Sequence, residues 1–126
     1  MESSSFNNDQ LIIDELGSKI LDSYTWWAKK RLLFNILVGL TGLLTILSFG
    51  FNFYIPDMLG ILAWGLVANG LYSFGYVVES LVLVRTKGAS RISQLRSLLF
   101  WLGTVAYMLV TLAFGYFYFF ALMHLD

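Results

Sequence analysis

Three long runs of apolar residues dominate the pattern along the chain. The runs cover residues 32–53, 58–84 and 98–123, and the only charged residue inside them is Glu79 in the second run. A helix rises about 1.5 Å per residue, so each run can span the roughly 30 Å of hydrocarbon in a bilayer. The pattern therefore predicts an all-α membrane protein with three transmembrane helices.

The segment before the first run has a different, amphipathic pattern. Its apolar residues recur at spacings of three and four, which is typical of one face of a helix: Ile13, Leu16, Ile20, Tyr24 and Trp27. We predict an amphipathic helix over about residues 9–29 that lies along the inner face of the membrane. The chain then divides into an acidic cytoplasmic segment, residues 1–28, and a three-span bundle, residues 29–126.

Positive charges predict the orientation of the spans. Seven of the eight basic residues flank the spans on one side: Lys29, Lys30, Arg31, Arg85, Lys87, Arg91 and Arg96. The positive-inside rule makes that side cytoplasmic. We therefore expect a multi-pass protein of the cell inner (plasma) membrane with its N-terminus in the cytoplasm and its C-terminus outside.

The two connections between spans carry turn signals. Asn52, Pro56 and Asp57 predict a short turn that makes the first two spans antiparallel neighbours. Gly88 suits the end of the second helix and Ser90 the N-cap of the third, which we expect to begin near Arg91.

Composition narrows the classes of function. Hydrophobic residues make up 58% of the chain and charged residues 13%, the formal net charge is zero, and there is no cysteine. These values exclude a disordered chain, a disulfide scaffold, a thiolate metal site and a basic nucleic-acid binder. The lone His124 has no second His or Cys to complete a metal site or a catalytic set. We expect no cofactor, no metal and no enzymatic activity.

Polar residues within the spans form the candidate functional site. An unsatisfied polar group facing lipid tails costs a few kcal/mol, on the order of 2–7 by transfer data, so these side chains should face one another. Most of them fall in the cytoplasmic half of the bilayer under the predicted topology. We predict one polar cluster centred on Glu79: Glu79, Asn35, Asn69, Tyr76, Thr104 and Tyr107.

Glu79 itself has two interpretations. It could be a proton or cation site, because ionisable residues within membranes often mark transport paths. It could instead be structural, paired with Arg85 or Lys30 or bonded to Tyr107. Its shallow depth, about 9 Å from Arg85 along the helix, favours the structural interpretation.

The chain resembles the prokaryotic diacylglycerol kinases in outline. Both have an N-terminal amphipathic segment, three spans and a Glu near the inner end of the second span. That family carries a Glu-x-x-Asn-(Ser/Thr)-Ala-x-Glu run there, whereas this chain reads Tyr-Ser-Phe-Gly-Tyr-Val-Val-Glu over residues 72–79. The second carboxylate is missing, so the resemblance does not imply the kinase activity.

We expect the protein to act through helix packing as an accessory, assembly or regulatory subunit. Its expected partners are membrane lipids and further copies of itself or other membrane protein subunits, with no nucleic acid. The alternative is a homo-oligomeric transporter or channel with a polar or proton site around Glu79. A lipid-modifying enzyme is the third interpretation.

Overall fold

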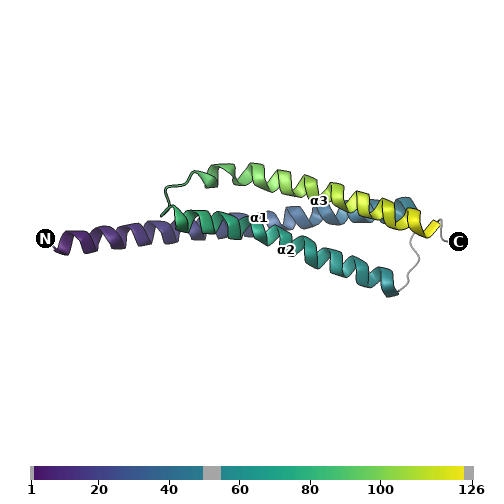
Figure 1. Ribbon diagram of the computed structural model, residues 1–126, viewed down its shortest axis with the longest axis horizontal. Coiled ribbons are helices and arrows are strands. Elements are labelled where there is room, and N and C mark those ends of the chain that lie inside the picture. Colours follow the sequence, from purple (N-terminus) through teal and green to yellow (C-terminus); the bar gives the residue numbers. More distant parts are fainter. Residues whose placement is uncertain (1, 50–54, 124–126) are drawn as a thin grey trace.

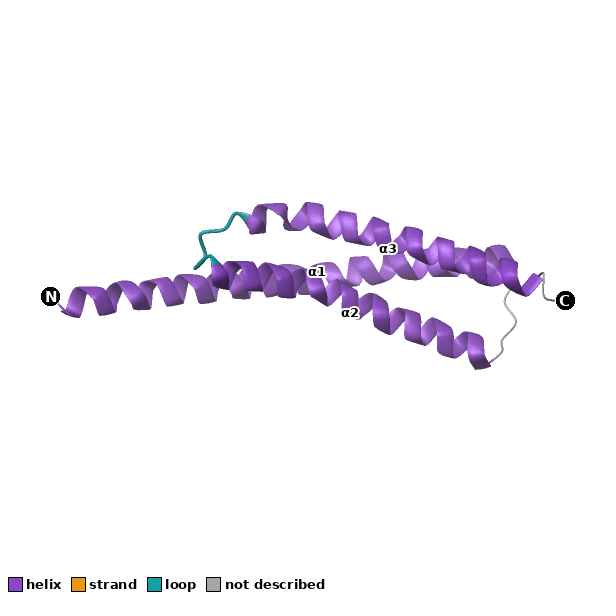
Figure 2. Ribbon diagram, in the orientation of Figure 1, coloured by secondary structure: helices purple, strands orange, loops and turns teal. Residues whose placement is uncertain are grey.

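The computed structural model of the protein describes the backbone of residues 2–49 and 55–123, and their side chains except those of residues 2–6, 49, 56, 119, 122 and 123. The described residues form three helices and no strand: α1 (Glu2–Phe49), α2 (Ile55–Arg85) and α3 (Ile92–Met123). The helices pack on one another along a common long axis, and α2 is antiparallel to both α1 and α3 (Figure 1, Figure 2). The predicted all-α architecture is confirmed, and each helix is long and apolar enough to cross a membrane.

The N-terminal half of the chain is one helix, where the sequence predicts two separate elements. α1 runs without a break through the predicted interfacial segment 9–29 and the described part of the first run. Residues 18–38 contain neither glycine nor proline, and the charged run Lys29–Arg31 consists of good helix formers. The predicted helix over residues 9–29 is confirmed as helical, but the prediction that it is a separate element is wrong, because the charged run does not break the backbone.

The first part of α1 projects beyond the rest of the bundle (Figure 1). Every described side chain from Asn7 to Glu15 is exposed. Leu16 and Lys19 then lie against the connection between α2 and α3, where Lys19 Nζ donates a hydrogen bond to the Gly88 carbonyl at 2.9 Å. Among the described side chains of the projecting segment, none from Asn7 to Glu15 is buried against the bundle.

The connection between α2 and α3 follows the predicted turn chemistry. Lys87 and Gly88 have positive φ angles of 49° and 78°, and the Gly88 N–H donates to the Leu83 carbonyl at 2.8 Å. This is the pattern of a Schellman helix end. Ser90 Oγ accepts a hydrogen bond from the Ile92 N–H at 3.1 Å, as an N-cap does. The predicted roles of Gly88 and Ser90 are confirmed, whereas the first predicted turn falls partly in residues 50–54, outside the described residues.

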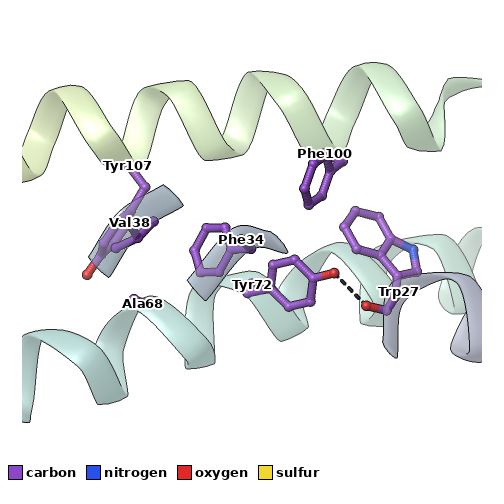
Figure 3. Packing of buried hydrophobic residues seen from close by; sticks show 7 residues of the cluster. All are labelled: Trp27, Phe34, Val38, Ala68, Tyr72, Phe100 and Tyr107. Carbon is purple, nitrogen blue, oxygen red and sulfur yellow. Dashed lines mark hydrogen bonds between the residues drawn. The ribbon is translucent and has the colours of Figure 1, made fainter. Parts of the chain in front are cut away.

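The buried core lies where the three helices meet and is largely aromatic (Figure 3). It contains Trp27, Phe34, Val38, Ala68, Tyr72, Phe100 and Tyr107. The Phe34 and Tyr72 rings lie 4.8 Å apart between centroids, and the Tyr72 hydroxyl donates to the Trp27 backbone carbonyl at 2.5 Å. Buried tyrosines need such a partner, so the core satisfies its polar atoms through the backbone of a neighbouring helix.

Over the three apolar runs of the sequence, the outward faces of the helices are apolar. Leu32, Leu66 and Leu102, one from each helix, are 69%, 68% and 65% exposed. Large contiguous apolar surfaces are unusual on soluble monomers but are normal for helices that face lipid. This surface supports a multi-pass membrane protein.

Candidate functional site

Glu79 lies inside the bundle, with only 1% of its surface exposed. The Trp27 indole N–H donates a hydrogen bond to Glu79 Oε2 at 2.7 Å. Gly75 precedes Glu79 by about one helical turn, and a Cβ atom at Gly75 would stand 2.6 Å from Cη2 of the Trp27 ring. The missing side chain at Gly75 therefore lets Trp27 lie against α2 beside the carboxylate.

Arg96, near the start of α3, supplies the positive charge next to Glu79. Its Nη2 atom lies 3.0 Å from Glu79 Oε1 in an ion pair, and its Nη1 atom donates a hydrogen bond to Asp22 Oδ2 at 2.9 Å. The Arg96 side chain is 10% exposed and the Asp22 side chain 70% exposed. We call Asp22, Trp27, Glu79 and Arg96 the Glu79 cluster.

The Glu79 cluster ties all three helices together through charge. Moving an ion out of water costs several kcal/mol, on the order of 20 by idealised estimates, and a partner of opposite charge recovers much of it. Here two carboxylates share one guanidinium, so the ionised cluster carries one net negative charge. Within the described part of the chain, no three His, Asp or Glu side chains gather to hold a metal ion. The arrangement is suited to holding helices in register.

The three predicted partners of Glu79 are wrong, because its ionic partner is Arg96. Arg85 is exposed at the end of α2. Lys30 Nζ lies 5.9 Å from the centres of two aromatic rings. Tyr107 donates its hydroxyl to a backbone carbonyl of α2 at 2.9 Å.

The six residues predicted to form one polar cluster are distributed over separate contacts. Asn35 Nδ2 donates to Asn69 Oδ1 at 3.3 Å. The Tyr76 ring packs edge-on against Tyr24 with centroids 5.6 Å apart, and the Thr104 hydroxyl donates to a carbonyl of its own helix at 2.7 Å. Among the described contacts, the structure brings Asn35 to Asn69 but pairs neither of them with Glu79.

Two polar contacts lie on the exposed edge of the α1–α2 interface. Arg31 Nη2 donates to Ser73 Oγ at 2.8 Å, and one helical turn away Asn35 donates to Asn69. Arg31 and Asn35 are exposed, and their partners on α2 are half-buried. We call these the α1–α2 polar pairs.

The seven basic residues predicted to form a cytoplasmic basic patch are spread along the bundle and do not form one surface. Arg31 lies beside Ser73, whereas Arg85 lies about 18 Å further along α2. Arg96 points into the bundle and belongs to the Glu79 cluster. Three further members are exposed: Lys29, Lys87 and Arg91. Along α2, Glu79 falls between the levels of Arg31 and Arg85.

The spacing of residues along α3 carries a sequence signal for the role of Arg96. Arg96, Phe100, Thr104, Tyr107 and Thr111 follow one another at spacings of three and four, and all five are buried in the structure. Extending the polar face of the third span backward by two turns would have placed Arg96 on the buried side. The prediction groups Arg96 with the charges of the loop and therefore does not place it on the buried face of α3.

Two apolar grooves open on the sides of the bundle. The N-terminal end of α2 diverges from α1 and α3 (Figure 1). One groove, of about 500 Å³, is lined there by all three helices, and Asp57 accepts a hydrogen bond from Tyr118 at its edge. The second, of about 480 Å³, lies mainly between α2 and α3 and includes Trp27 and Tyr72. Neither groove is lined by Glu79.

Comparisons of the chain with protein-family models, with curated proteins and with solved structures find no significant match.

Proposed function

We propose that the chain is a small inner-membrane protein that acts through helix packing, as an accessory, assembly or regulatory subunit joined to further copies of itself or to other membrane proteins. The proposal rests on the α1–α2 polar pairs. Their exposed members, Arg31 and Asn35, lie on an edge of the bundle that the chain itself does not cover.

An exposed amide on a membrane span favours contact with another helix. A side-chain amide has two N–H donors and an acceptor oxygen, and the contact with Asn69 uses one donor of Asn35. Lipid tails offer no partner for the rest, whereas a polar side chain on a neighbouring helix does, a contact worth about 0.6–2 kcal/mol. Another helix packed on this edge would complete the hydrogen bonding of Asn35.

The orientation within the membrane follows from charge. The C-terminal end of α2, with Arg85, lies at the end of the bundle that also carries the projecting part of α1 (Figure 1), and Arg31 lies about 18 Å further along α2, beside Ser73. The positive-inside rule assigns that end to the cytoplasm and the C-terminus to the outside. The projecting part of α1 then extends into the cytoplasm, where it offers a second surface for a partner.

The alternative, a homo-oligomeric transporter or channel with its site at Glu79, has less support. A transported proton or cation must reach the carboxylate, but Glu79 is 1% exposed, is bonded to Trp27 and Arg96, and lines neither groove. The cluster is better suited to a structural role.

Cysteine cross-linking in native membranes tests the proposal directly, because the chain has no cysteine of its own. Leu32→Cys places a thiol beside the α1–α2 polar pairs, and Leu102→Cys places one on α3 with similar exposure as a matched control. We expect a cross-linked product at Leu32→Cys whose mass identifies a second copy or another protein. Equal cross-linking at both positions, or only the monomer at both, would contradict the proposal.

A further inference from the structure

Two buried serine hydroxyls in the bundle lack the hydrogen bond to their own helix that most other hydroxyl side chains make. Eight hydroxyl side chains in the helices or directly after α2 donate to the carbonyl four residues earlier: Thr25, Thr41, Thr45, Ser48, Ser73, Thr86, Thr104 and Thr111. Ser23 Oγ and Ser80 Oγ are buried and make no hydrogen bond to any described group. Buried hydroxyls are nearly always bonded, so these two are directed toward another partner.

Ser23 lies at the Glu79 cluster. It is 0% exposed, follows Asp22 directly and precedes Trp27 by one turn of α1. Asp22, next to Ser23 in the chain, bonds Arg96, and Trp27, one turn later, bonds Glu79. The residues on either side of Ser23 on this face therefore contact the same ion pair.

Ser80 reaches the same level of the bundle from α2. It follows Glu79 in the chain and lies one turn after Tyr76 and two turns after Ser73, both of which contact α1. This spacing puts Ser80 on the face of α2 that meets α1. The two serines therefore lie on α1 and α2 at the level of the Glu79 carboxylate.

The ion pair itself has two buried atoms with unused hydrogen-bonding capacity. Glu79 Oε1 lies 3.0 Å from Arg96 Nη2 in the ion pair but accepts no well-aligned hydrogen bond, and Arg96 Nε donates none to the described chain. The Nε–H of Arg96 can only donate a hydrogen bond, and Oε1 of the ionised Glu79 can only accept one. The hydroxyls of Ser23 and Ser80 can do either. We infer that the Glu79 cluster is a binding site for ordered water between the three helices, in which water accepts from Arg96 Nε, donates to Glu79 Oε1 and bonds the hydroxyls of Ser23 and Ser80.

Water fits this set of groups better than a cation does. Buried waters typically bond two to four otherwise unsatisfied polar atoms, which is what these four atoms provide. A sodium ion could bind the carboxylate and the hydroxyls, but it would meet the guanidinium of Arg96, whose Nε–H needs an acceptor. The positive charge already beside Glu79 therefore selects a neutral ligand.

The sign of a stability change distinguishes a hydrated site from a dry one. If water bridges the groups, Ser23→Ala and Ser80→Ala each remove a bonding partner, and each should lower Tm by about 3 °C relative to the control Ser18→Ala. Ser18 is exposed and bonds a carbonyl of its own helix, so Ser18→Ala reports the effect of a Ser-to-Ala change in a helix alone. If the site is dry, both changes remove an unsatisfied hydroxyl and should raise Tm above the control.

Thermal unfolding of the full chain in detergent micelles measures these shifts, and a rotating-frame NOE between water and the Arg96 Nε–H detects the water itself. Lowered Tm in both variants together with the NOE supports the inference. A Tm at or above the control in either variant, or no NOE, overturns it. Replacing sodium chloride by choline chloride tests for the cation: if the stability difference between Ser23→Ala and the unchanged protein vanishes without sodium, the ligand is the ion and the inference is wrong.

Discussion

Arg96 Nη2 on α3 lies 3.0 Å from Glu79 Oε1 on α2, and the carboxylate side chain is 1% exposed. Glu79 lies along α2 between the levels of Arg31 and Arg85, and Arg96 also bonds Asp22, which is exposed. The guanidinium thus joins a buried carboxylate on α2 to an exposed one on α1, so α3 is tied to both other helices at one level of the bundle.

Neutralising Glu79 should destabilise the bundle. Glu79→Gln keeps an oxygen that can accept from Trp27, but it leaves Arg96 without its buried counter-charge. We expect a loss of about 3 kcal/mol in the free energy of unfolding. Reversible unfolding in mixed micelles, followed by circular dichroism, measures it.

A double-mutant cycle isolates the pair. Arg96→Met alone leaves the buried Glu79 carboxylate without a counter-charge. The Glu79→Gln, Arg96→Met double variant should therefore lose less free energy of unfolding than the sum of the losses of the two single variants. Glu15→Gln is the matched control, because Glu15 pairs with Lys19 on the exposed part of α1 and should contribute about 0.5 kcal/mol or less. Additive losses, or a Glu79→Gln loss no larger than that of Glu15→Gln, would show that the buried pair does not hold the helices.

Adding a methyl group at Gly75 should also destabilise the bundle. The new Cβ atom would stand 2.6 Å from the Trp27 ring, which its bond to Glu79 keeps in place. We expect Gly75→Ala to cost about 1–3 kcal/mol. Gly70→Ala on the same helix meets no atom within 4 Å, so it should be neutral or gain up to about 1 kcal/mol from helix propensity. Similar unfolding midpoints for the two variants would rule out the close approach.

The helices could be predicted from the sequence because hydrophobic runs of this length and turn residues such as Gly88 and Ser90 act locally. The single α1 could not be predicted in the same way, because Lys29–Arg31 mark a boundary in polarity that a helix can cross without bending. From the sequence alone, the change in polarity at residues 29–31 predicts the end of one helix and the start of another.

Of the candidate site, the sequence predicts Glu79 but not its partners. Glu79 is the only charged residue in its span, whereas its partners depend on how the helices are rotated and shifted against one another. Gly75 admits the Trp27 ring, and that contact sets the register of α1 on α2. The same register brings Asp22, from a segment expected on the membrane surface, to Arg96. Such partners follow from packing between helices, which spacing along one helix does not specify.

Replacing Lys87 by glycine should stabilise the connection between α2 and α3. Lys87 has a φ of 49°, a left-handed conformation that costs a non-glycine residue about 1–2 kcal/mol, and its side chain is exposed. We expect Lys87→Gly to raise the free energy of unfolding by about 1 kcal/mol. Lys87→Ala removes the same charge but keeps the Cβ atom, so it should show no gain. If both variants shift stability equally, charge and not backbone conformation is responsible.

Removing the projecting part of α1 should leave the bundle intact. Deleting residues 2–15 removes described side chains that are all exposed, so the free energy of unfolding should change by no more than about 0.5 kcal/mol. Deleting residues 2–24 instead removes Asp22 and Ser23 from the Glu79 cluster, and the loss should then exceed about 1 kcal/mol, since Arg96 loses its second carboxylate. Unfolding in micelles compares the two truncations, and a large loss already in the shorter one would mean that the projecting segment packs on the bundle. Purification of the shorter truncation from native membranes adds a functional readout, because a partner bound by the projecting segment should be lost while the folded bundle is retained.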